Sequence, residues 1–286
     1  MRKYVIVAES GADLTPEQIA KHQIKIVRMH VEMDNRDYID DEITIKDLTD
    51  YYDRTHKVPK TAGVNPHQFE EIFAEIKRET PEAVVLHLCY SAQLSIGFQS
   101  SLIANDEEMS IYRIDTKQVS VGQAFVVLKT VELIEKQPEI EPEDLVKQIE
   151  AIVKKTRFHF VPGNLDYLRA GGRVSNSQYL GAKLLRVRPL IELLDGLMIS
   201  TKKYQGAKKD IMRKMIDEFF KNNNIDKDLV FTGCSVFIEE DIKEAMIAQI
   251  KTYGVKNIIW FTTGAVITSH AGPGGAGLVG MEVLSD

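Results

Sequence analysis

Short apolar runs alternate with helix-type patterns along the first half of this chain, and this alternation constrains the fold more than any other feature. The runs Tyr4–Ala8, Ala83–Cys89 and Ile111–Asp115 have the length and apolar content of buried strands. A Thr-Pro helix start at Thr15 follows the first run, and a helical pattern over Gly122–Glu135 follows the third. We therefore predict a mainly parallel sheet with helices on both faces.

Two further elements are expected between these runs. Apolar and charged residues alternate over about Ile24–Met33, which predicts a second strand. Asn65-Pro66 opens another helix, in which Phe69, Phe73 and Ile76 recur at helical spacing along one face. That face should pack against the sheet.

The pattern changes after a connector rich in Pro and Glu, Gln137–Glu143, and the helix that follows it. Leu190–Leu194 and Leu197–Thr201 flank Asp195-Gly196, which is a strong turn signal for a β-hairpin. The remaining expected elements are Leu145–Thr156, Lys208–Phe220, Leu229–Val236, Ile242–Tyr253, Asn257–Thr262 and Gly277–Val283. We predict an N-terminal α/β domain over residues 1–156 and a C-terminal α+β domain, containing the hairpin, over residues 157–286.

Charge and cysteine usage exclude several classes of function. The formal net charge of −6 argues against a dedicated nucleic-acid-binding protein, which needs clustered Lys and Arg. Cys89 and Cys234 stand far apart without metal-ligand spacing, so no metal site is expected. The apolar run at the N-terminus is too short for a signal peptide, and no run approaches the length of a membrane span. We expect a cytoplasmic protein.

The run Gly272–Gly277 matches the letters of the dinucleotide loop G-x-G-x-x-G. That loop must open a helix and lead to a second strand, with an acidic residue about twenty positions later. Because the printed sequence stops at Asp286, we reject this interpretation and expect a loop that lets backbone or ligand approach His270 closely.

Hydroxyl side chains follow several of the predicted strands. They are Ser10, Thr61, Ser91, Ser95, Thr116 and Ser120. Singly, each is most simply a helix cap or turn residue. Because the carboxyl ends of parallel strands direct their loops into one crevice, together they predict a hydroxyl-lined, uncharged rim. Such a rim suits an oxyanion that is held by hydrogen bonds without a strong counter-charge.

Residues 165–209 carry nine basic and three acidic side chains, although the chain as a whole is acidic. They include Arg169 and Arg173 as well as the basic segment 183–189. A solvated basic face is the simplest interpretation. The alternative is a docking surface for an acidic partner or an anionic membrane surface.

A serine hydrolase is the sharpest enzymatic alternative. Ser95, Asp115 and His270 occur in the chain order of α/β-hydrolases. The sequence around Ser95 lacks the G-x-S-x-G elbow that exposes the nucleophile, and the chain has no G-K-[ST] phosphate loop for a kinase. Both absences count against an enzyme.

Six segments, in order along nearly the whole chain, resemble the DegV family of bacterial fatty-acid-binding proteins. The most specific is Leu165–Val174, which is similar to the family signature L-D-Y-L-x-x-G-G-R. The others are Val7–Leu14 (family T-D-S-x-x-D-L), Lys60-Thr61, Gln93–Ser100 (family G-L-S-G-T-Y-Q-S), Ile114–Lys117 (family I-D-S-K) and Thr268–Gly274 (family T-H-x-G-P-G).

The resemblance implies a two-domain carrier, not an enzyme, with an acyl chain in a tunnel between the domains. A Thr, a Ser and a His hold the carboxylate in the family, and the matching residues are Thr61, Ser95 and His270. The implied ligand is a long-chain fatty acid such as palmitate, with no cofactor and no metal. Members deliver the acid to a fatty acid kinase, and the implied partner surface comprises Arg169, Arg173, Lys202 and Lys203.

The physical chemistry of such a ligand agrees with these residue types. Each buried methylene contributes about 0.8 kcal/mol to binding. The carboxylate cannot follow the chain into apolar surroundings unpaired, so hydroxyls and an imidazole must donate to it. Candidates for the tunnel neighbourhood are Phe69, Phe73, Phe98 and Tyr167.

The sequence departs from the family pattern at several of these positions. Glu9 replaces an Asp, Ala62 and Thr116 each replace a Ser, and Ile96-Gly97 stands where Gly-Thr is common. Gln205 stands where many relatives carry an Arg on the surface used by the kinase. Lipid binding is therefore a stronger expectation than delivery to a kinase.

Overall fold

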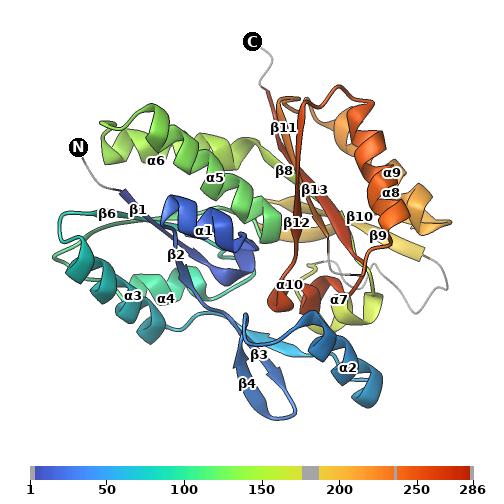
Figure 1. Ribbon diagram of the computed structural model, residues 1–286, viewed down its shortest axis with the longest axis horizontal. Helices are drawn as coiled ribbons and strands as arrows, with labels where there is room; N and C mark the ends of the chain where they lie inside the picture. Colours follow the sequence, from blue (N-terminus) through green and yellow to red (C-terminus); the bar gives the residue numbers. More distant parts are fainter. Residues whose placement is uncertain (1–3, 176–186, 235–236, 284–286) are drawn as a thin grey trace.

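The computed structural model describes residues 4–175, 187–234 and 237–283, and in these ranges the strands form three sheets (Figure 1). A parallel sheet belongs to the N-terminal half and a larger, mainly antiparallel sheet to the C-terminal half. A small third sheet lies below them in Figure 1, beside α2.

The N-terminal sheet is parallel throughout, as predicted. Its strands, in order across the sheet, are β2 (Lys25–Val27), β1 (Tyr4–Glu9), β6 (Val84–Cys89) and β7 (Ser110–Asp115). The helical elements of this half are η1 (Ser10–Ala12), α1 (Pro16–His22), α2 (Ile45–Thr55), α3 (Pro66–Glu79), α4 (Gly97–Ile103), α5 (Ser120–Lys136) and α6 (Pro142–Lys155).

The period of two along β1 divides its side chains between two cores. Val5 and Val7 pack in the core that holds Phe69 and Phe73 of α3, whereas Ile6 belongs to the core formed with α5 and α6. The predicted coverage of the sheet on both faces is therefore confirmed. The expected apolar face of α3 is also buried.

Side-chain caps explain where two of these helices begin. Thr15 accepts from the backbone N–H of Gln18, and the Gln18 side chain accepts from the backbone N–H of Thr15. Asn65 and Gln68 form the same reciprocal pair at α3, and a Pro follows each cap. These capping boxes confirm the two helix starts expected from the sequence.

The C-terminal sheet is antiparallel except for its last pair, β11 and β12. Its strands, in order across the sheet, are β10 (Leu197–Gln205), β9 (Val187–Leu194), β8 (Thr156–Val161), β13 (Ala276–Met281), β11 (Leu229–Cys234) and β12 (Asn257–Thr262). Asp195 and Gly196 form the turn between β9 and β10 with φ values of 48° and 84°, which confirms the predicted hairpin.

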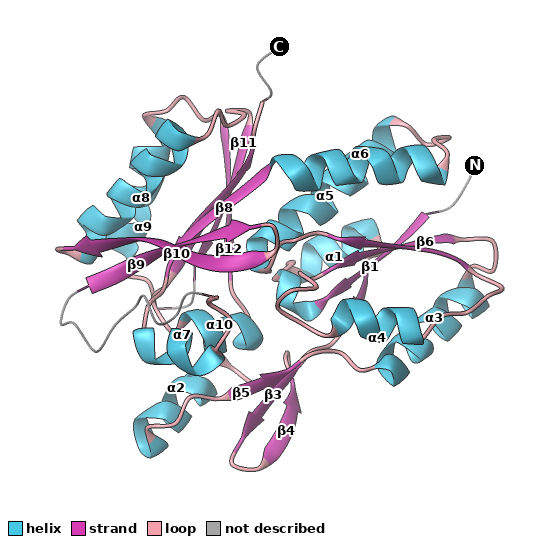
Figure 2. Cartoon of the chain, turned by 180° about the vertical axis from the view of Figure 1, so that it is seen from behind, coloured by secondary structure: helices cyan, strands magenta, loops and turns pink. Residues whose placement is uncertain are grey.

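Helix α5 lies between the two large sheets (Figure 2). It contacts β1 and β6 on one side and β8, β11 and β13 on the other, and the ring centroids of Phe125 and Phe231 are 5.0 Å apart across this interface. The remaining helices are α7 (Leu165–Gly171), α8 (Lys208–Asn222), α9 (Glu240–Lys251) and α10 (Ala265–Ala271). None of the helices in the described ranges combines the length and the apolar character that crossing a bilayer requires.

The single strand predicted over Ile24–Met33 is wrong, because the chain forms two strands there in different sheets. After β2 it turns at Met29, whose N–H donates to Ser10 Oγ and whose carbonyl accepts from the N–H of Asp40. The following strand, β3 (His30–Met33), pairs instead with β4 (Arg36–Ile39) and β5 (Lys60–Ala62) in the antiparallel third sheet.

Candidate functional site

A polar cavity opens where β5, the loop after β6, the end of α7 and helix α10 meet. Its polar side chains come from Thr61, Tyr90, Gln93, Ser95, Arg173 and His270. The structure thus brings together the three residues that the family resemblance assigned to a carboxylate.

His270 presents one ring nitrogen to this cavity. Its Nε2 lies 2.8 Å from Thr61 Oγ1. Its Nδ1 faces Gly171 of α7, so closely that a methyl group in place of the glycine hydrogen would come within 2.3 Å of the nitrogen. This Nδ1 makes no hydrogen bond to the described residues. Buried donors without a partner are rarer in proteins than buried acceptors without one, so we place the ring proton on Nε2.

The imidazole is neutral at physiological pH. Burial, together with the positive charge of Arg173, lowers the pKa of His270 to about 4. A neutral ring with its proton on Nε2 donates a hydrogen bond toward Thr61 or toward a ligand in the cavity.

Ser95 and Arg173 add further donors to this cavity. Ser95 Oγ accepts from the N–H of Gly97 at 3.3 Å, which leaves its own proton free to donate. Arg173 Nη1 donates to the carbonyl of Gly171 at 2.7 Å, and the guanidinium retains further N–H groups. Because a charged Arg lines this cavity, the expected uncharged rim is wrong in that respect.

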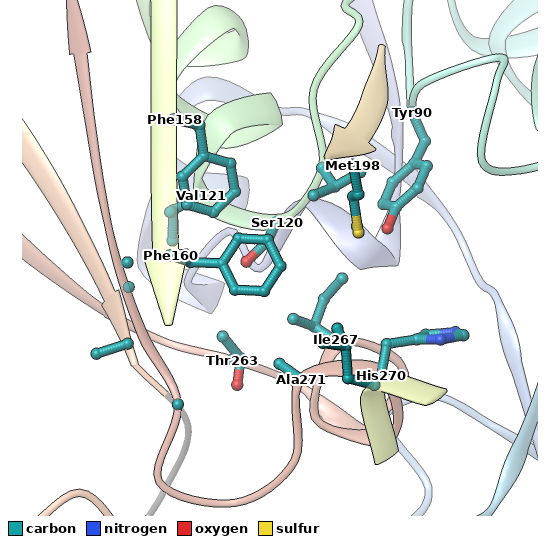
Figure 3. A pocket seen from close by; sticks show the side chains of 16 residues that line it. Tyr90, Ser120, Val121, Phe158, Phe160, Met198, Thr263, Ile267, His270 and Ala271 are labelled. Atoms are coloured by element: carbon teal, nitrogen blue, oxygen red, sulfur yellow. The ribbon is translucent and has the colours of Figure 1, made fainter. Parts of the chain in front are cut away.

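A second, apolar cavity is lined by residues of α5, β8, β11, β13 and α10 and shares part of its wall with the first (Figure 3). Tyr90, Met198 and His270 line both cavities, so these three residues lie at the boundary between them, which we call the neck. Beyond the neck the wall includes Val121, Phe158, Phe160, Leu168 and Ile267. The first cavity is edged by hydrogen-bond donors and the second by apolar side chains, and the neck residues are common to both.

The aromatic residues expected near a tunnel do not line this cavity. Phe69 and Phe73 pack behind the N-terminal sheet on α3, and neither Phe98 nor Tyr167 reaches the cavity wall. Phe158 and Phe160 line it instead, because alternate residues of β8 point to the same face of the sheet. The spacing of two residues between Phe158 and Phe160 in the sequence indicates that both rings lie on the same face of a strand.

The other predicted hydroxyls bind to the protein itself. Ser10 accepts from Met29 N–H, and Ser91 and Thr116 donate to the carbonyls of Gly196 and Cys89. Ser120 donates to Asp13, and of these four it alone lines one of the two cavities. Thr61 reaches the site from β5 and not from the end of a parallel strand, contrary to the strand-end argument.

Two buried acidic side chains that sequence reasoning missed anchor the helix that carries His270. Asp13 Oδ1 accepts from the N–H of Gly264 at 2.7 Å, and Asp40 Oδ1 accepts from the N–H of Val266 at 2.9 Å. Both acceptors satisfy free donors at the start of α10. Burial raises the pKa of Asp13 to about 8 and also raises the pKa of Asp40.

The structure does not assemble the groups of a serine hydrolase. Asp115 Oδ1 accepts from the backbone N–H groups of Ala92 and Lys117. Within the described residues no carboxylate bonds to His270, whose Nδ1 meets Gly171 where a triad would place an acid.

The basic residues predicted for a partner surface lie in different settings. Arg173 is exposed and lines the polar cavity, whereas Lys202 and Lys203 lie on β10, with Lys202 Nζ 2.5 Å from Glu218. Arg169 is partly buried on α7, and Gln205 is exposed at the end of β10. The basic segment 183–189 falls partly outside the described residues.

The glycine-rich run after His270 leads from α10 into β13 and opens no helix, in agreement with the rejection of a dinucleotide loop. Gly272 and Gly274 adopt φ values of 74° and 78°. In the described ranges no group of three or more His, Cys, Asp or Glu side chains is placed to hold a metal ion.

Fold and site together define an α/β protein in which a polar cavity adjoins an apolar cavity beside the two large sheets. A family model described as "Uncharacterised protein, DegV family" matches residues 3–282. The chain therefore belongs to the DegV family, and the resemblance found in its motifs is confirmed.

Relatives extend over the whole chain. A protein of Thermotoga maritima named fatty acid-binding protein is 29% identical over 288 residues, which cover 99% of this chain and 98% of that protein. A DegV family protein from Thermus thermophilus, solved for its fatty acid binding, has a TM-score of 0.88 at 24% identity, covering 99% of this chain and 100% of that one. A stearic acid-binding protein from Eubacterium ventriosum has a TM-score of 0.83 at 25% identity, covering 98% of each chain.

Proposed function

We propose that this protein binds one long-chain fatty acid, with the carboxylate in the polar cavity and the acyl chain in the apolar cavity. The observation that carries the proposal is that a cavity edged by hydrogen-bond donors and an apolar cavity adjoin each other at the neck residues Tyr90, Met198 and His270. The relatives named for fatty acid binding support the same ligand class.

The donors suit a carboxylate in a partly enclosed site. Thr61, Ser95 and neutral His270 offer hydrogen bonds, and Arg173 adds a positive charge at the exposed side. A carboxylate that lost water without such partners would be strongly disfavoured. The apolar wall then gains about 0.8 kcal/mol for each methylene that it covers.

We further propose that the ligand lies in a tunnel between domains formed by residues 1–156 and 157–286, and that the protein is a carrier and not an enzyme. The separation of Ser95, Asp115 and His270 into different hydrogen-bond networks supports the absence of hydrolysis. Delivery to a fatty acid kinase, or contact with an anionic membrane, would use Arg169, Arg173, Lys202 and Lys203 as the basic surface.

Extraction of the purified protein tests the binding proposal. Organic extracts analysed by mass spectrometry should contain about one saturated or monounsaturated C14–C18 acid per chain. The proposal is wrong if the extracts hold no such acid and the delipidated protein also fails to bind any of them. Pull-down of a fatty acid kinase with and without ligand separately tests the carrier role.

A further inference from the structure

Tyr90 is fixed at the neck between the two cavities. It follows the last residue of β6 directly, and its backbone N–H donates to Glu9 Oε2 at 2.8 Å. Its ring packs against Gly11, where a methyl group would come within 3.1 Å of the ring and 2.9 Å of Met29 Sδ. Only 5% of Tyr90 is exposed, so the ring has little freedom to leave the neck.

The hydroxyl of Tyr90 faces the apolar cavity. Figure 3 shows the side chain pointing into the cavity beside Met198, with its oxygen toward the side on which Ile267 and His270 lie. Burial raises the pKa of Tyr90 well above its usual value, so the phenol keeps its proton at physiological pH. It therefore remains both a donor and an acceptor.

This hydroxyl makes no hydrogen bond to any residue that the structure describes. The other two neck residues are poor hydrogen-bond partners for this hydroxyl, since Met198 is a weak acceptor and His270 Nε2 is paired with Thr61. An unsubstituted acyl chain that filled the neck would exclude water and leave the phenol unpaired, which is unfavourable.

We propose that the site prefers a long-chain acid with a hydroxyl on its second or third carbon, and that Tyr90 recognises this hydroxyl. The inference rests on the proposed fatty acid binding and adds a substrate class to it. His270 lines both the polar cavity and the neck, so a carboxylate held by its Nε2 places the first few carbons beside Tyr90. A hydroxyl there pairs with the phenol, whereas one at the far end of the chain does not reach it.

The test is a titration of delipidated protein with palmitate, 2-hydroxypalmitate, 3-hydroxypalmitate and 16-hydroxypalmitate. Wild-type protein should bind the 2- or the 3-hydroxy acid about five- to tenfold more tightly than palmitate, as one additional buried hydrogen bond implies. The 16-hydroxy acid should show no such preference. In Tyr90→Phe, the ratio of the dissociation constant of palmitate to that of the preferred hydroxy acid should fall to about one.

Tyr167→Phe is the matched control. Its hydroxyl is buried and has no hydrogen-bond partner among the residues that the structure describes, but Tyr167 lines neither cavity. This variant should keep the wild-type ratio. A wild-type ratio near one for both hydroxy acids overturns the inference, as does a preference that survives in Tyr90→Phe. If Tyr90→Phe weakens palmitate and the hydroxy acid equally, Tyr90 binds the carboxylate and the inference is also wrong. Failure of every acid to bind would instead contradict the proposed function.

Discussion

At the scale of single residues, the surroundings of each side chain set which hydrogen bonds the polar cavity can donate. His270 Nδ1 faces Gly171 and has no hydrogen-bond partner among the described residues, in keeping with a ring proton on the cavity side. The Ser95 hydroxyl is also oriented, because its oxygen accepts a hydrogen bond from the N–H of Gly97 and its proton can then be donated to a ligand. The site is thus prepared to donate hydrogen bonds before a ligand arrives.

Removal of one donor should weaken acid binding without loss of the fold. We expect Ser95→Ala to raise the dissociation constant of palmitate by the equivalent of about 1–3 kcal/mol, since a carboxylate oxygen loses its partner. Thr61→Val and His270→Ala should have effects of the same size. Calorimetric titration measures each. Ser110→Ala, at the exposed start of β7 and away from both cavities, is the control. Equal affinity in Ser95→Ala and this control would place the carboxylate elsewhere.

Asp13 should make stability depend on pH in an unusual direction. Its pKa is about 8 in the folded protein against 3.8 as the ordinary value, so the folded state binds more protons between these values. The associated stability is fully present below pH 3.8 and is lost as pH rises through 8, by at most about 1.4 kcal/mol per pH unit.

Asp13→Asn tests this expectation, because an amide keeps the shape but does not titrate. Urea unfolding between pH 5 and pH 8 should give a stability that falls more steeply with pH in the wild type than in the variant. Parallel pH profiles for the two proteins would show that Asp13 titrates normally.

At the scale of elements, two departures from the family pattern, Glu9 at the end of β1 and Gly97 at the start of α4, are coupled by a direct contact. Glu9 at the end of β1 is fully buried and accepts from Tyr90 N–H and Gln123 Nε2, each at 2.8 Å. Its other oxygen lies 3.2 Å from His87 Nε2, and a methyl group at Gly97 would come within 2.7 Å of that oxygen. The longer acid therefore needs a glycine at the start of α4.

This coupling predicts non-additive stability changes. Gly97→Ala should destabilise the protein by about 1–3 kcal/mol through crowding against Glu9. Glu9→Asp should also destabilise it, through lost hydrogen bonds, but the shorter acid leaves room for the new methyl group. The double variant should lose less free energy of unfolding than the sum of the single variants. Strict additivity in a denaturant-unfolding cycle would contradict the coupling.

The elements with local signals were the predictable ones. Helices α1 and α3 begin at their capping boxes, and the β9–β10 hairpin turns at Asp195-Gly196. The third sheet was missed although Asp34 and Asn35, with φ values of 52° and 59°, form the turn between β3 and β4. Its third strand, β5, has only the residues Lys60–Ala62, and its pairing partner is distant in sequence. So short a segment carries no periodicity of its own.

At the scale of the molecule, the site exists only because separate layers meet. Thr61 lies on β5, Ser95 follows β6 and His270 lies on α10, and 209 positions separate Thr61 from His270. The alternation of strands and helices predicted the layers, and the motifs predicted these three residues. Neither could show that Arg173 lines the same cavity or that Asp13 and Asp40 anchor α10, because those contacts depend on how loops from both halves pack.

The most direct test of the central claim compares palmitate with its methyl ester on delipidated protein by calorimetric titration. Both ligands carry the same apolar chain, but only the acid offers a carboxylate to Thr61, Ser95, Arg173 and His270. Palmitate should bind with one-to-one stoichiometry and at least about tenfold more tightly than the ester, in keeping with the loss of charge-assisted hydrogen bonds. Equal affinities, or no binding of the acid, would contradict the account.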